Sequence, residues 1–232
     1  MRKFWSLGSI FWVLSFGSGA YGQSPFPLET GTVWRYQGTQ TCYNTQASKE
    51  TPQPLSLQME VLQSTKIGTI TIAEVRGGFL DPECGEKLQP STYLFILKDQ
   101  TKLYYSVRRA GNTDPVAAVE TFAGLTDILR KNGGRFALVQ KNFELLLNMN
   151  PIRAKRFASK RYDWSVESST PIQLENIKGS GTQAKTGYLL AQRDNTGFFE
   201  LIFVPNLGFC KLRYHHNGST NDFDLGLVEY HP

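Results

Sequence analysis

Alternation of polar and apolar residues dominates the chain and predicts a mainly β protein. Thr69-Ile70-Thr71-Ile72 shows the two-residue period most plainly, and successive side chains of a strand point to opposite faces of a sheet. Segments rich in β-branched and aromatic residues recur along most of the chain, as is typical of strands. The strands that we expect are residues 32–43, 55–62, 68–75, 92–97, 102–107, 162–167, 172–177, 187–191, 198–203, 209–215 and 223–230.

One stretch has a helical period instead. Apolar residues recur there at three- and four-residue spacing: Val119, Phe122, Leu125, Ile128 and Leu129. Asp114 followed by Pro115 is typical of a helix start, and Asn132-Gly133-Gly134 is typical of a helix end. We therefore expect one α-helix at about 115–131, with its apolar face packed on a sheet. Residues 136–147 fit either a helix or a strand, and we favour extended structure from Phe143.

The distribution of strands around this helix suggests a two-part domain. Strand patterns run over about 26–110 and again over about 143–232, and the helical bridge 114–134 lies between them. Each part opens on a strand that contains a tryptophan, Trp34 or Trp164. We expect one β-rich domain over residues 23–232. Its fold would be an antiparallel, curved open sheet or partial barrel, built from two similar halves and one packed helix.

Residues 1–22 have the three parts of a secretory signal peptide. Arg2 and Lys3 give a positive start, residues 4–16 are uncharged and mainly apolar, and small residues follow. We expect cleavage after Ala20 or two residues later. The apolar run is shorter than the ~20 residues that span a bilayer. The mature protein should thus be periplasmic or secreted, without a transmembrane segment.

The charge of the mature chain is small. The formal net charge is +5, and loss of Arg2 and Lys3 with the signal lowers it to +3 (5 − 2). Such a weak bias gives no argument for a nucleic-acid partner. Apolar residues make up 40% of the chain, which is enough to bury a core.

The three cysteines differ in their surroundings. Cys42 and Cys84 lie in polar, turn-rich sequence, whereas Cys210 lies in an apolar strand-like run. An oxidising compartment favours a bridge between exposed cysteines, and a thiol among apolar residues usually behaves as a small buried hydrophobe. We expect a disulfide between Cys42 and Cys84 with Cys210 free, and the sequence leaves the other pairings open.

Two stretches at the ends of the mature chain resemble a group of uncharacterised exported bacterial proteins. Phe26-Pro27-Leu28-x-x-Gly31-x-x-Trp34-x-Tyr36 resembles the opening of that group's mature domain, which begins with a PLxxGxxW motif. A degenerate second copy runs from Asn150-Pro151-Ile152 to Trp164, with Lys155-Arg156-Phe157 in place of the usual glycine. The proteins of this group end with a PGxG turn, an HHGT-like turn and an LxE strand. Three segments here are similar to these, in the same order: Val204-Pro205-Asn206-Leu207-Gly208-Phe209, Tyr214-His215-His216-Asn217-Gly218-Ser219 and Leu227-Val228-Glu229-Tyr230. The resemblance implies export and a β-rich, two-part domain, and it implies no known activity.

One cluster has metal-ligand chemistry. His215, His216, Asp222 and Asp224 flank the hairpin signal Asn217-Gly218, and imidazole and carboxylate groups are ligands of Zn²⁺. Adjacent residues of a strand point to opposite faces, however, so both histidines reach one ion only if the strand breaks there. We favour a polar β-turn in which one histidine is hydrogen-bonded.

Five cations fall within nine residues between the two halves: Arg153, Lys155, Arg156, Lys160 and Arg161. Such a patch suits an anionic partner, either a phospholipid or lipopolysaccharide surface or an acidic polysaccharide. A solvated connecting loop is the favoured interpretation, because short charge runs usually face water.

The sequence selects no catalytic residue. It contains no nucleophile elbow, no phosphate-binding glycine loop and no HExxH motif. We therefore expect a non-catalytic binding or structural protein of the bacterial cell envelope, without a cofactor. One alternative is a carrier that holds a lipid or other hydrophobic ligand between sheet and helix. The other is a metal-dependent hydrolase at the histidine cluster.

Overall fold

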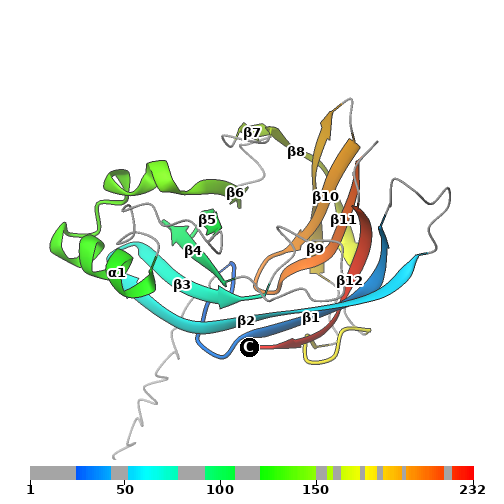
Figure 1. The fold of residues 1–232 in the computed structure, drawn as a ribbon, viewed down its shortest axis with the longest axis horizontal. Coiled ribbons are helices and arrows are strands. Elements are labelled where there is room, and N and C mark those ends of the chain that lie inside the picture. The colour runs from blue at the N-terminus through cyan, green and yellow to red at the C-terminus, as the bar shows by residue number, and fades with distance from the viewer. Residues whose placement is uncertain are drawn as a thin grey trace, which may run out of the picture.

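The described part of the chain folds as one curved antiparallel sheet of twelve strands in a computed structural model (Figure 1). The residues described are 25–42, 52–77, 92–107, 121–149, 156–158, 163–172, 176–181, 185–194, 197–216 and 221–232. The predicted signal peptide lies outside them. No helix among these residues is long and apolar enough to cross a membrane.

The first half runs from β1 to β6. Its elements are β1 (Val33–Cys42), β2 (Gln53–Ile67), β3 (Ile70–Arg76), β4 (Thr92–Lys98), β5 (Lys102–Val107), α1 (Phe122–Lys131), the 3₁₀ helices η1 (Phe136–Leu138) and η2 (Gln140–Asn142), and β6 (Glu144–Asn148). The second half contains β7 (Arg156–Ala158), β8 (Asp163–Ile172), β9 (Lys185–Asp194), β10 (Gly197–Val204), β11 (Gly208–His216) and β12 (Asn221–His231).

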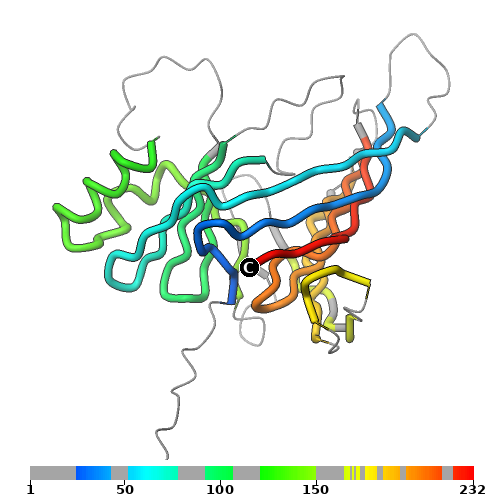
Figure 2. The backbone as a smooth tube through the Cα atoms, turned by 90° about the horizontal axis from the view of Figure 1, so that it is seen from below, coloured from blue at the N-terminus to red at the C-terminus, as the bar shows by residue number. Residues whose placement is uncertain are grey.

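Each half is a meander, and the two meet at the centre of the sheet. The strand order is β6-β5-β4-β3-β2-β1-β12-β11-β10-β9-β8-β7. β1 pairs with β12 over its full length, from Val33 opposite His231 to Cys42 opposite Asn221. The sheet bends into an open U, with β2 to β5 in one wall and β8 to β12 in the other (Figures 1 and 2). The predicted mainly antiparallel, curved and open sheet is confirmed.

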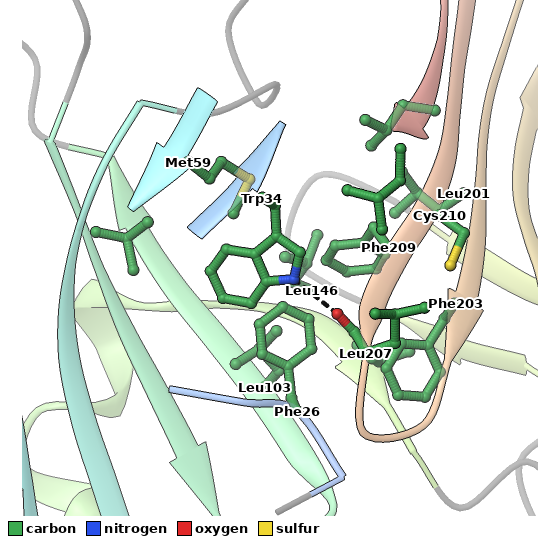
Figure 3. Close-up of a cluster of buried hydrophobic side chains, with 14 of the residues drawn as sticks. Phe26, Trp34, Met59, Leu103, Leu146, Leu201, Phe203, Leu207, Phe209 and Cys210 are labelled. Carbon is green, nitrogen blue, oxygen red and sulfur yellow. Dashed lines mark hydrogen bonds between the residues drawn. The ribbon is translucent and has the colours of Figure 1, made fainter. Parts of the chain in front are cut away.

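The concave face is filled by one large apolar cluster (Figure 3). Phe26, 1% exposed, lies at its centre, just before the first strand. Its ring centroid is 5.8 Å from that of Trp34 in β1, 6.4 Å from Phe95 in β4, and 6.3 Å from Phe203 in β10. The segment that leads into the sheet thus packs between the two walls and joins them.

Helix α1 covers the opposite face of the first wall. Leu125 and Leu129 are fully buried against Ile70, Ile72 and their neighbours. Side chains along β3 and β4 alternate between the two faces of the sheet. These isoleucines therefore face the helix, while Val75 and Phe95 face the concave core. The first wall is therefore apolar on both faces, which explains the nearly continuous burial of β4.

The helix begins later than the sequence predicted. Thr121 is extended, and its side chain accepts a hydrogen bond from the Gly124 amide at 3.0 Å, so Thr121 is the N-cap and Phe122 the first helical residue. The predicted start at Asp114 and Pro115 lies outside the described residues. The predicted end is confirmed, since Asn132 is the C-cap.

Other boundaries also differ from the prediction. The strand expected at 172–177 is wrong at its end: β8 stops at Ile172, and Ile177 accepts a turn hydrogen bond from the Ser180 amide. The short strand β7 was missed within the basic stretch. Extended structure after Phe143 is confirmed, and this strand, β6, pairs with β5. Trp164 lies in β8, the second strand of its half, opposite Phe157 of β7.

Candidate functional site

The hairpin between β11 and β12 brings His215 and Asp222 together. The two strands run antiparallel, with Arg213 opposite Asp224 and Tyr214 opposite Phe223, so that His215 and Asp222 follow at the end of the ladder. The His215 Nδ1 atom lies 2.8 Å from Asp222 Oδ2. The histidine side chain is 41% exposed and the aspartate 19%. This pair is oriented, and it is reachable from solvent.

The pair lines a surface depression of about 360 Å³. The depression opens on the face of the sheet that is turned away from the core, because Tyr214 and Phe223 pack into the concave cluster and their neighbours alternate with them. β1 contributes two hydroxyls, and β10 contributes an aromatic ring. The lining residues are Thr39, Thr41, Phe198, Arg213, Tyr214, His215, Asp222, Phe223 and Asp224.

A row of ion pairs crosses the sheet beside this depression. Asp224 on β12 contacts Lys211 Nζ and Arg213 Nε, each at 3.3 Å. On β10, the Glu200 side chain is only 11% exposed and lies 3.0 Å from Arg213 Nη1 and 2.5 Å from Arg193 Nη2. These contacts link four neighbouring strands, β12, β11, β10 and β9, and they restrict the positions of the charged side chains beside the depression.

The row ends on β8. Arg193 on β9 donates two hydrogen bonds to Glu167, at 2.9 and 3.1 Å. The guanidinium lowers the pKa of the Glu167 carboxyl, and the hydrogen bonds to Glu167 and then to Glu200 raise the pKa of Arg193. Arg193 is therefore charged at neutral pH, as arginines in proteins generally are.

Phe198 forms the aromatic wall of the depression. Arg193 and Arg213 lie over its ring, with their guanidinium carbons 5.7 and 5.5 Å from the ring centroid. The imidazole ring of His215 is 5.5 Å away, centroid to centroid. Both arginines are thus held by carboxylates and by the face of one ring, which limits their motion.

The predicted metal ligands are only partly brought together. His215 and Asp222 form the pair described above, while Asp224 is bound by Lys211 and Arg213. His216 is the last residue of β11, and its side chain lies outside the described set. Within the described residues, no group of three or more His, Cys, Asp or Glu side chains could hold a metal ion. The metal interpretation stays a prediction.

The predicted anionic-partner patch falls almost wholly outside the described residues. Arg156 begins β7, and its backbone pairs with Ser165; Arg153, Lys155, Lys160 and Arg161 are not among the described positions. The patch therefore stays a prediction too.

Residues of the N-terminal motif and of the PGxG-like turn meet in the core (Figure 3). The Trp34 indole N–H donates a hydrogen bond to the Leu207 carbonyl at 2.6 Å, and the Tyr36 hydroxyl donates one to the Phe209 carbonyl at 2.9 Å. Gly208 lies between them with φ +101°, and a Cβ there would come within 3.0 Å of the Trp34 Nε1 atom. The two motifs are therefore structural partners, although more than 170 residues separate them.

The terminal LxE-like segment carries a second polar cluster. Glu229 contacts Arg35 at 2.5 Å, Lys178 at 2.9 Å and His231 at 2.9 Å. Hydrogen bonds from Lys178, His231 and Arg35 lower the pKa of Glu229 to about 2. The Lys178 backbone also bonds to Val228 and Tyr230 of β12. These contacts hold residues 176–181 against β12, one of the two strands at the centre of the sheet.

The cysteines have different environments. Cys210 is a free, buried thiol, and burial raises its pKa to about 12. Cys42 ends β1 and is disulfide-bonded. Cys84 lies outside the described residues, so its pairing with Cys42 stays a prediction.

Sequence reasoning found His215, Asp222 and Asp224 but missed Phe198, Arg213 and the β1 hydroxyls. The first three flank an Asn-Gly hairpin signal, which places them opposite each other. The others reach the depression only through the register of β10 and β1 with their neighbours. Nothing in the local sequence indicates that register.

No protein-family model matches the chain, and no curated protein matches it. Two crystal structures are similar to it. One is a "putative lipoprotein" from Parabacteroides distasonis, with 14% identity over 90% of this chain and 99% of that one, and a TM-score of 0.42. The other is a "putative exported protein with YmcC-like fold" from Bacteroides fragilis, with 13% identity over 89% and 98% and a TM-score of 0.43.

Proposed function

We propose that the chain is an exported, non-catalytic binding protein of the bacterial cell envelope, and that the depression around His215 and Asp222 is its ligand-binding surface. The observation that carries the proposal is the composition of this hollow. It offers two threonines, a histidine–aspartate pair and an aromatic ring around a volume of about 360 Å³, beside Arg213 and Asp224, which ion pairs hold in place. Convergent, immobilised polar groups beside an aromatic ring are typical of a ligand site.

Export is supported by the sequence of residues 1–22. The cationic start, the apolar run and the small residues that follow match a cleavable signal peptide. The destination would be the periplasm or the medium. The resemblance to exported bacterial proteins supports the same destination, and we propose membership of that group because its motif residues Trp34 and Gly208 pack against each other here.

A non-catalytic role is supported by the state of the reactive groups. A nucleophile or general base needs to reach a substrate in the right protonation state. The Cys210 thiol is buried with a pKa near 12, and Asp224 is bound by two cations. His215 and Asp222 are oriented by each other. No serine or cysteine is among the described residues that line the depression with them.

The alternatives have less support. A hydrophobic ligand between sheet and helix would need apolar space there, but Leu125 and Leu129 fill that interface with the side chains of β3 and β4. A metal-dependent hydrolase would need further ligands to join His215 and Asp222. Elemental analysis of the purified protein distinguishes this option, since a hydrolase would carry stoichiometric metal.

We also propose the Cys42–Cys84 bridge. Its support is that Cys42 is disulfide-bonded while Cys210 is free and buried, in a chain with three cysteines. Peptide mapping without reductant tests it. A Cys42 peptide linked to anything other than the Cys84 peptide contradicts it.

Native mass spectrometry of protein from the periplasmic fraction tests the binding function. We expect a co-purifying small molecule on the wild type that is lost in Thr39→Trp, because the indole would fill the depression. Gln37→Trp is the matched control, since Gln37 is exposed on the same strand and face but does not line the hollow. Loss in both variants, or in neither, would show that the ligand binds elsewhere. A wild type without any bound molecule would contradict the proposal.

A further inference from the structure

A second surface, at the end of the molecule that carries α1, combines cations with an exposed leucine. Leu138 is 52% exposed and is the single large hydrophobic side chain that stands out in this way among the described residues. It ends η1, between the end of α1 and β6. Its neighbours Phe136 and Val139 pack inward, and Leu138 is not part of the core cluster that they join.

The local geometry places cations around Leu138. The Leu138 amide bonds to the Arg135 carbonyl, three residues back, and side chains three residues apart in a 3₁₀ turn lie on one side. Arg135, Leu138 and Lys141 are all exposed, while Phe136 and Val139 are buried. The leucine therefore stands on the outer side of this segment, and cationic residues precede and follow it.

Neighbouring elements add further positive charge to this surface. Arg130 and Lys131 end α1 just before this segment. From the β4–β5 hairpin, Lys98 lies over the Phe136 ring, with its Nζ atom 5.9 Å from the centroid, and Lys102 is opposite Lys98 in the ladder. Residues 98–102 and 121–144 together hold six cationic and three acidic side chains. Their net charge of +3 equals that of the whole mature chain.

We propose that this basic end, defined by Lys98, Lys102, Arg130, Lys131, Arg135, Leu138 and Lys141, docks on a bilayer that contains anionic phospholipid. Cations near an anionic membrane are attracted to its surface, and an apolar side chain among them enters the boundary between headgroups and acyl chains. A soluble polyanion would match the charge but would leave Leu138 in water. The exposed leucine is what favours a bilayer. The proposal is independent of the ligand site at His215, which lies in the other wall.

Vesicle co-sedimentation of the full mature protein tests the proposal. The vesicles are phosphatidylcholine alone, or phosphatidylcholine mixed with phosphatidylglycerol. We expect binding only to the mixed vesicles, weakening as salt is added. Arg135→Gln with Lys141→Gln should lower the affinity about fivefold for each cation removed. Leu138→Ser should lower it about tenfold, through lost apolar burial.

A charge-matched control distinguishes the effect of cations at the basic end from the effect of the protein's total charge. Arg76→Gln with Lys178→Gln removes two cations from exposed positions elsewhere and should leave the affinity within about twofold of the wild type. Thermal melting verifies that each variant is folded. The proposal fails if phosphatidylcholine vesicles bind as well as mixed ones, or if neither binds. It also fails if the control pair weakens binding as much as the test pair, or if Leu138→Ser binds like the wild type.

Discussion

Replacing Phe26 by alanine should strongly destabilise the protein, because this side chain packs between the two walls of the concave core. Phe26 precedes β1 and belongs to no strand, yet its side chain is 1% exposed. It touches aromatic residues from both walls of the sheet, with the Phe209 ring nearest at a centroid distance of 5.3 Å. Its loss would leave a cavity where the two halves meet, and neither wall can close that cavity without bending the sheet.

The expected cost follows from the burial. A buried Phe→Ala change costs about 3–5 kcal/mol, and the four ring contacts place Phe26 in the upper part of that range, at about 4 kcal/mol. For a chain of this size, 1 kcal/mol shifts the melting temperature by about 2–4 °C. The variant should therefore melt about 8–16 °C below the wild type.

Urea unfolding followed by tryptophan fluorescence is the appropriate assay, because the Trp34 ring lies 5.8 Å from Phe26. Phe26→Leu should give an intermediate value, since it keeps apolar volume but loses the ring contacts. Leu138→Ala should stay within about 0.5 kcal/mol of the wild type, because that side chain is largely exposed. A cost below about 1 kcal/mol for Phe26→Ala, at an unchanged m-value, would refute the role of this segment as the joint between the walls.

Four further predictions concern single groups. Gly179→Ala places a Cβ 1.9 Å from the Tyr230 carbonyl at a φ of +86°, so it should cost more than about 1 kcal/mol and speed amide exchange at Tyr230. Glu229, with a pKa near 2 against its usual 4.5, stabilises the fold above pH 4.5 and loses this effect as the pH falls toward 2; Glu229→Gln should flatten acid denaturation curves across that window. The Cys210 thiol, with a pKa near 12, should not react with a disulfide reagent at pH 8 until urea unfolds the chain. Glu200→Gln should lower stability by about 1–2 kcal/mol in thermal melts, since it removes the charge between two arginines.

The period of the sequence predicted the strands best where one face of the sheet is solvated. In β1 the buried side chains Trp34 and Tyr36 alternate with the exposed Arg35 and Gln37, so the pattern is directly readable. β2 was predicted to end near Leu62, because the polar run after it has no apolar period. In the structure that run continues the hairpin with β3. Pairing with a neighbour extended the strand, and local composition does not contain that information.

Long-range partners limited the prediction of the site. His215 and Asp222 were named together because a turn signal lies between them, and they do form a pair. The Glu200 carboxylate was not named, since its partners come from β9 and β11 and depend on the register of both ladders. The same limit applies to the pairing of β1 with β12, which joins residues nearly the whole length of the domain apart.

The motif residues and the candidate site lie on opposite faces of the same strands, and this separates fold from function. Trp34 and Tyr36 of β1 point into the concave core, where they bond to the carbonyls of Leu207 and Phe209. Thr39 and Thr41 of the same strand line the depression on the other face. Substitutions at the first pair should therefore change stability, whereas those at the second should change binding with little effect on melting. Because side chains alternate along a strand, β1 carries the joint between the halves on one face and the proposed binding surface on the other.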